Sequence, residues 1–125
     1  MSRIALTFGD TVKSFPELEN STSRKVQKAI KSILEKTANE VLRALRIADR
    51  DYNDRTGNLR SSWKKRKLKG YKWKIGNSAK YASFIENGTR YITPRRMLHR
   101  ELRNARARLR RRFRALSHRV IQGTI

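Results

Sequence analysis

Residues 81–90 have the sequence YASFIENGTR, and this stretch decides the fold that we predict for the chain. Tyr81, Phe84 and Ile85 have the i, i+3, i+4 spacing that lets a short helix bury all three on one face. Gly88 then ends this helix, because glycine tolerates the left-handed conformation that follows a helix end. We therefore predict a rigid elbow, anchored by Phe84 and Ile85, with Gly88 at positive φ.

Glu86 stands just before the predicted stop of this short helix. It is one of two acidic residues in the second half of the chain; the other is Glu101. We expect Glu86 to form a salt bridge or a helix-end contact with Arg90 or Lys80. The two acids are too far apart in sequence to indicate an acid/base pair, and His99 and His118 have no ligand or triad arrangement. We predict no enzyme, no metal and no cofactor.

Two long segments flank the elbow, and both have the period of amphipathic helices. The first covers residues 22–48, with Asn20-Ser21-Thr22-Ser23 as candidate caps. Its apolar stripe consists of Val26, Ile30, Ile33, Leu34, Thr37, Val41, Leu45 and Ala48. We expect this stripe to pack on the chain's own sheet rather than on a coiled-coil partner.

The second long helix is predicted over residues 94–122, with Thr93 as cap and Pro94 at the first position. Its apolar seam consists of Leu98, Leu102, Ala105, Leu109, Phe113, Leu116 and Val120. A helix of this length is about 42 Å long. We expect its second half to project, so that the seam needs either Val26–Leu45 or a neighbouring subunit.

Short alternating segments predict a small antiparallel sheet. Ile4, Leu6 and Phe8 alternate with other residues in a first strand within residues 1–20, where the segment after the strand has no clear pattern beyond a turn. In residues 56–77, Trp73 and Ile75 alternate with lysines, and a hairpin turn is expected near Lys69-Gly70. The preceding strand is too charged to be central.

Residues 56–63 predict a short capped turn of helix, with Thr56 as cap and Leu59 and Trp63 pointing inward. Basic residues surround Trp63, Tyr71 and Trp73, which leaves two interpretations open. The aromatic side chains either stack on the bases of single-stranded nucleic acid or fill the core beneath the sheet.

Charge is the strongest feature of the composition. The 125 residues carry a net charge of +22, of which +20 lies in residues 55–125. A chain this basic indicates an anionic partner. On the second long helix, five arginines lie opposite the seam and form a candidate face for DNA or an acidic protein partner: Arg96, Arg100, Arg103, Arg111 and Arg114.

The elbow resembles the signature of a tailed-bacteriophage head–tail joining family, also called tail-completion, neck or minor capsid proteins. The matching residues are Tyr81, Ala82, Glu86, Gly88, Thr89, Arg90 and Pro94. An upstream motif of the family is matched by Thr56, Gly57, Leu59 and Ser62. The resemblance covers roughly residues 20 to 105. The family usually has Arg-Pro-Phe-Leu at the last helix, whereas this chain has Pro-Arg-Arg-Met-Leu at residues 94–98.

Taken with this resemblance, the prediction is a single α+β domain over residues 1–125: a small antiparallel sheet, a long helix packed on it, an elbow at residues 79–90 and a long basic C-terminal helix. The resemblance implies a structural virion protein of the phage neck that joins head to tail, or completes or terminates the tail. It further implies a ring of identical subunits, sixfold by family analogy. The implied partners are connector or portal-side proteins, tail tube proteins and packaged DNA, the last contacted without sequence specificity.

Composition alone favours an alternative, a small sequence-independent nucleic-acid-binding protein of ribosomal or nucleoid type. The elbow and the upstream motif favour the neck protein, because nucleic-acid binding explains neither. The absence of cysteine, of an apolar run in residues 1–20 and of any membrane-spanning stretch leads us to expect residence in the host cytoplasm before assembly into the virion.

Overall fold

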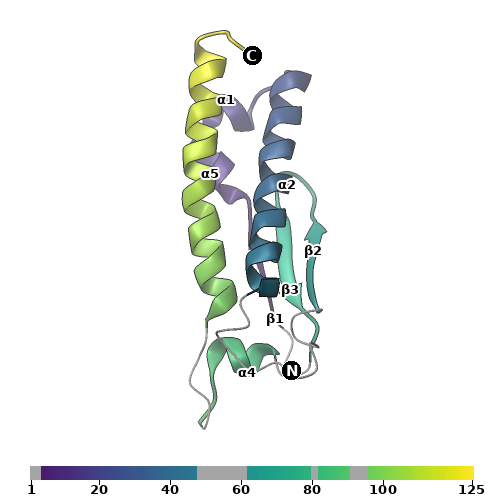
Figure 1. Ribbon diagram of the computed structural model, residues 1–125. Coiled ribbons are helices and arrows are strands. Elements are labelled where there is room, and N and C mark those ends of the chain that lie inside the picture. Colours follow the sequence, from purple (N-terminus) through teal and green to yellow (C-terminus); the bar gives the residue numbers. More distant parts are fainter. Residues whose placement is uncertain (1–3, 48–61, 80–81, 91–95) are drawn as a thin grey trace.

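The computed structural model describes residues 4–47, 62–79, 82–90 and 96–125. Its elements, in chain order, are β1 (Ile4–Phe8), the 3-10 helix η1 (Asp10–Ser14), α1 (Pro16–Glu19), α2 (Arg24–Ile47), β2 (Trp63–Lys67), β3 (Trp73–Asn77), α4 (Ala82–Asn87) and α5 (Met97–Ile121). The long helices α2 and α5 lie side by side and pack together and on a three-stranded antiparallel sheet (Figure 1). The predicted α+β class is confirmed.

The sheet has the strand order β1-β3-β2, so β3 is central and pairs antiparallel with both neighbours. Ile75 is opposite Leu6 on one side and Lys65 on the other. The predicted hairpin is confirmed: Gly70 has a φ of 77°, and the Leu68 N–H donates to the carbonyl of Lys72 at 2.9 Å. The lysine-rich strand β2 is an edge strand, as its charge predicted.

Helix α2 buries the stripe that its sequence predicted. The fully buried side chains recur at steps of three and four, and comprise Val26, Ile30, Leu34, Thr37, Ala38, Val41, Leu42 and Leu45. Ile33 is half-buried at the edge of this stripe, and Ala48 lies outside the described residues. The hydroxyl of Thr37 donates to the carbonyl of Ile33 at 2.8 Å, which satisfies a polar group inside the stripe.

Helix α5 buries its predicted seam, but it begins later than predicted. The first helical residue is Met97, preceded by Arg96 in a left-handed conformation with φ of 51°. The predicted start at Thr93 and Pro94 lies outside the described residues. Every member of the seam is buried except Val120, which is half-buried. The predicted seam is confirmed, and the helix as described runs from Met97 to Ile121.

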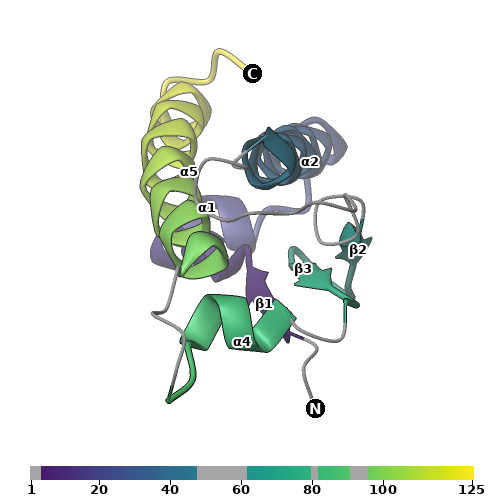
Figure 2. The same cartoon turned by 60° about the horizontal axis from the view of Figure 1, so that its bottom comes forward.

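The second half of α5 does not project, which corrects our expectation. Leu109 and Phe113 are fully buried, because α2 covers one side of the seam and the segment after β1 covers another (Figures 1 and 2). Phe15 meets the ring of Phe113 edge-to-face, with the ring centroids 6.1 Å apart. Leu18 of α1 is buried in the same cluster. Residues 10–19, which have no clear pattern in the sequence beyond a turn, therefore complete this core.

Truncating the seam in its second half should destabilise the isolated chain. Phe113→Ala should lower the free energy of unfolding by about 3–5 kcal/mol, as large core truncations do. Ile121→Ala, at a side chain that is 72 % exposed on the same helix, should change it by less than about 0.5 kcal/mol. Urea unfolding at low protein concentration measures both. Equal midpoints for the two variants would contradict the packing of this half.

One polar cluster crosses the interface between the two long helices. Arg112 of α5 donates two hydrogen bonds to the carboxylate of Glu40 on α2, at 2.7 and 2.9 Å, and a third to the hydroxyl of Thr37 at 2.6 Å. The Nε of Arg108 lies 3.6 Å from the same carboxylate. The hydrogen bonds from Arg112 hold the pKa of Glu40 below its ordinary value, and they raise the pKa of Arg112.

This cluster should make stability depend on pH in the acidic range. Because the pKa of Glu40 is lower in the folded chain than its ordinary value of 4.5, the stabilisation is present above about pH 5 and is lost as the pH falls through the folded pKa. The Glu40 side chain is 36 % exposed, so we expect an effect on the order of 1 kcal/mol. Glu40→Gln should therefore destabilise the chain more at pH 7 than at pH 3, measured by urea unfolding. Glu35→Gln, at an exposed position of α2, is the control, and an equal loss at both pH values would argue against this role.

Candidate functional site

The elbow predicted from the sequence is present as α4, which runs from Ala82 to Asn87. Gly88 follows it with a φ of 77°, and its N–H donates to the carbonyl of Phe84 at 2.8 Å. This is the left-handed helix end that favours glycine, so the predicted positive φ is confirmed.

The face of α4 that is buried is not the one predicted. Ala82 and Glu86 are buried and Ile85 is half-buried against the core, whereas Phe84 is 45 % exposed. Ala82, Ile85 and Glu86 have the same i, i+3, i+4 spacing as the predicted set, one residue later. Phe84 therefore projects from the opposite side of α4, and its prediction as an anchor was wrong. Tyr81 lies outside the described residues.

Glu86 connects the elbow to the last helix, a role that we did not predict. Its side chain is 1 % exposed, and its two carboxylate oxygens accept hydrogen bonds from the backbone N–H groups of Leu98 and His99, at 2.9 and 2.8 Å. The Nδ1 of His99 lies 2.5 Å from the same carboxylate. The backbone carbonyl of Glu86 accepts the N–H of Arg96 at 3.1 Å.

These contacts give α5 a cap that comes from another helix. The first N–H groups of a helix lack partners within the helix, and its N-terminus favours negative charge. Arg96, at the N-cap position, makes no side-chain capping bond, and the first turn contains no acid. That local deficiency is the signal that could have indicated a distant cap. Glu86 supplies it from twelve residues earlier in the chain.

The remaining motif residues have mixed outcomes. Thr89 and Arg90 are exposed beyond the end of α4. The motif members Thr56, Gly57, Leu59 and Pro94 lie outside the described residues, so their predicted roles are untested. Trp63 is buried, as predicted, although it begins strand β2 instead of ending a helical turn.

The aromatic side chains of the hairpin belong to the core. Trp63 is fully buried, and Tyr71 and Trp73 are partly buried against the same cluster. The ammonium of Lys65 lies 5.1 Å from the centre of the Trp73 ring and also contacts the side chain of Asn39 on α2. The interpretation that these aromatics fill the core beneath the sheet is the one that the structure supports.

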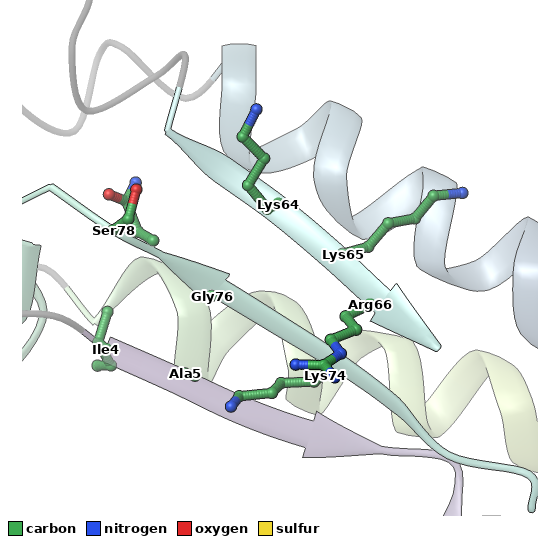
Figure 3. A pocket seen from close by; sticks show the side chains of 9 residues that line it. Ile4, Ala5, Lys64, Lys65, Arg66, Lys74, Gly76 and Ser78 are labelled. Atoms are coloured by element: carbon green, nitrogen blue, oxygen red, sulfur yellow. The ribbon is translucent and has the colours of Figure 1, made fainter. Parts of the chain in front are cut away.

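The sheet face turned away from the helices is basic and has a small-residue floor (Figure 3). A shallow hollow of about 350 Å³ lies over Ala5 and Gly76, with Lys64, Arg66 and Lys74 around it. A Cβ on Gly76 would come within 2.9 Å of the Ala5 Cβ, so the close approach of β1 and β3 requires glycine there. Arg66 and Lys74 are direct cross-strand partners, and like charges in that position repel.

The predicted arginine face of α5 divides into two parts. Arg96, Arg100 and Arg103 gather with His99 and Arg106 around a hollow of about 520 Å³ at the start of the helix, which we call the arginine hollow. The other two predicted residues, Arg111 and Arg114, are exposed farther along the helix.

Within the described residues, no group of three or more acidic or histidine side chains could hold a metal ion. The same part of the chain contains no helix that is long and apolar enough to cross a membrane.

Comparison with known families decides the class of protein. Residues 16–88 match the model of the HK97-gp10-like family, described as "Bacteriophage HK97-gp10, putative tail-component". The chain belongs to this family. No curated protein and no solved structure matches it.

Membership of the HK97-gp10-like family makes this chain a phage tail component, a structural protein and not an enzyme. The matched segment contains α1, α2, the hairpin and α4, and it ends at Gly88. Glu86 therefore lies inside the match, while α5, which it caps, lies beyond it.

Removing the cap should destabilise this tail component. Glu86→Ala leaves the N–H groups of Leu98 and His99 without partners, and each unsatisfied buried donor costs about 1–3 kcal/mol. We expect a total loss of roughly 2–5 kcal/mol in urea unfolding. Glu86→Gln keeps one acceptor oxygen and should lose less. Glu101→Gln, at a partly exposed acid on α5, is the control, and an unchanged midpoint for Glu86→Ala would rule out the capping role.

Proposed function

We propose that this HK97-gp10-like protein works in the phage neck, where it joins head to tail or completes the tail as a ring of identical subunits. The observation that carries the proposal is the exposed Phe84 on α4. Aromatic side chains are the usual anchors of protein interfaces, and this one is presented by an elbow that Glu86 ties to the last helix. A contact between this anchor and a different patch on the next subunit would be heterologous, and such contacts form a ring when the rotation from one subunit to the next closes.

The seam of α5, which first suggested a ring, does not support one. Its apolar side chains are covered within the subunit by α2, Phe15 and Leu18. Net charge also opposes association, because identical chains at +22 repel one another. We therefore expect the ring to form in the presence of its virion partners or at raised salt, where repulsion is screened.

The alternative of a free-standing ribosomal or nucleoid protein rested on composition. Family membership assigns the chain to the phage tail, so this alternative is not retained. The partners that we propose are the connector or portal-side proteins on one side and the tail tube on the other.

Native mass measurement tests the ring. The assembled particle should contain a closed oligomer of fixed subunit number, and the isolated chain should move from monomer toward that oligomer as salt is raised. Phe84→Ala should reduce oligomer formation while changing the free energy of unfolding by less than about 1 kcal/mol, because its side chain is already half in solvent.

Ile121→Ala is the matched control, since among the described residues it removes the other large exposed apolar side chain, at the C-terminal end of α5. A monomer both in the particle and at high salt would refute the ring. A Phe84→Ala variant that assembles normally would refute the proposed anchor.

A further inference from the structure

The arginine hollow brings four guanidinium groups together around one cavity at the start of α5. Among the described residues, its lining consists of Arg96, His99, Arg100, Arg103 and Arg106, without an acid or an apolar side chain. Four of these five side chains are guanidinium groups, which remain charged at any physiological pH.

The backbone around the hollow is held in place by contacts to other elements. The Glu86 cap and the bond from the Arg96 N–H to the Glu86 carbonyl hold the start of α5 against α4. On the other rim, Arg106 donates to the carbonyl of Thr7 on β1 at 3.2 Å. Both rims are therefore held by contacts to other elements, so a ligand would meet arginines whose backbone positions are set in advance.

The nearby acids do not enter the hollow. Glu86 is buried, and its oxygens face the N–H groups of Leu98 and His99. Glu101 follows Arg100 directly on the helix and is not part of the lining. The cavity therefore keeps a strong net positive charge.

We propose that the arginine hollow binds the phosphodiester backbone of a nucleic acid, without reading its sequence. A guanidinium group can donate two hydrogen bonds at once to a phosphate. Protein interfaces with nucleic acid are also more polar and more positively charged than interfaces between proteins. A docked protein would be expected to find apolar anchors at the centre of its site, and the described residues that line the hollow offer none. This site is independent of the ring, because a monomer contains all of it.

The exposed Arg111 and Arg114 lie along the same helix beyond the hollow. With a rise of about 1.5 Å per residue, Arg96 and Arg114 are about 27 Å apart along α5. A backbone held in the hollow can therefore continue beside further cations, which favours a polymer over a single small anion.

The test is the salt dependence of binding to a 30-base-pair duplex, measured with two unrelated sequences. The measured quantity is the slope of the logarithm of the binding constant against the logarithm of the salt concentration, whose magnitude rises by about 0.9 for each phosphate contact. The variant Arg96→Gln/Arg100→Gln/Arg103→Gln should lower this magnitude by about 2–3 units. The variant with lysine at the same three positions should keep most of the slope and lose affinity. Lysine retains the positive charge, but it lacks the planar guanidinium group that binds a phosphate through two hydrogen bonds. Both sequences should bind alike.

The matched control removes the same charge from the open sheet face, with Lys64→Gln/Arg66→Gln/Lys74→Gln, and should leave the slope within about half a unit of the parent. Thermal melting confirms that each variant is folded. Equal decreases of the slope in the two glutamine variants would overturn the site in favour of diffuse charge.

Two further results would also overturn the proposal. Binding of polyglutamate in preference to duplex would assign the hollow to an acidic protein. Displacement of duplex by inorganic phosphate at matched ionic strength would assign it to a small anion.

Discussion

The buried carboxylate of Glu86 is the contact on which the arrangement of this protein's second half depends. It is the polar link between the elbow and α5, and it compensates a helix start that has no cap of its own. A carboxyl group at 1 % exposure is tolerated only where hydrogen-bond partners surround it, and the first turn of α5 supplies them. This contact holds the start of α5 against α4, and it therefore helps to place the arginines at the beginning of that helix.

The chain keeps a very high charge by separating it from a conventional apolar core. Helix α5 turns its seam toward α2, Phe15 and Leu18, and turns most of its arginines outward. Where a guanidinium does approach the interface, at Arg112, the carboxylate of Glu40 and the hydroxyl of Thr37 accept its bonds. Buried charge is thus paired, and unpaired charge is left to solvent and to partners.

Long periodic segments could be predicted from the sequence, and short ones could not. Seven turns of α2 define one apolar face, so its buried residues and bounds were predicted nearly as found. The elbow is so short that two faces of its helix have the same i, i+3, i+4 spacing. The prediction chose the face with Phe84 instead of the face with Ala82 and Glu86, and it was wrong because packing against α5 decides which face of α4 is buried. The cap itself could not be predicted by local spacing, since donor and acceptor are twelve residues apart. Residues 10–19 had no period because η1 and α1 are each about one turn long.

The two proposals are physically linked, although each can stand alone. Subunits with a net charge of +22 repel one another, and the arginines gathered at the start of α5 contribute to this repulsion. A polyanion bound in the arginine hollow would neutralise part of this charge. It would therefore favour the proposed contacts between subunits, which are made through Phe84 on α4. Such coupling is reciprocal, so assembled subunits would also bind the polyanion more tightly than isolated ones. A basic helix beyond the matched segment would then make assembly of the tail component conditional on its anionic partner.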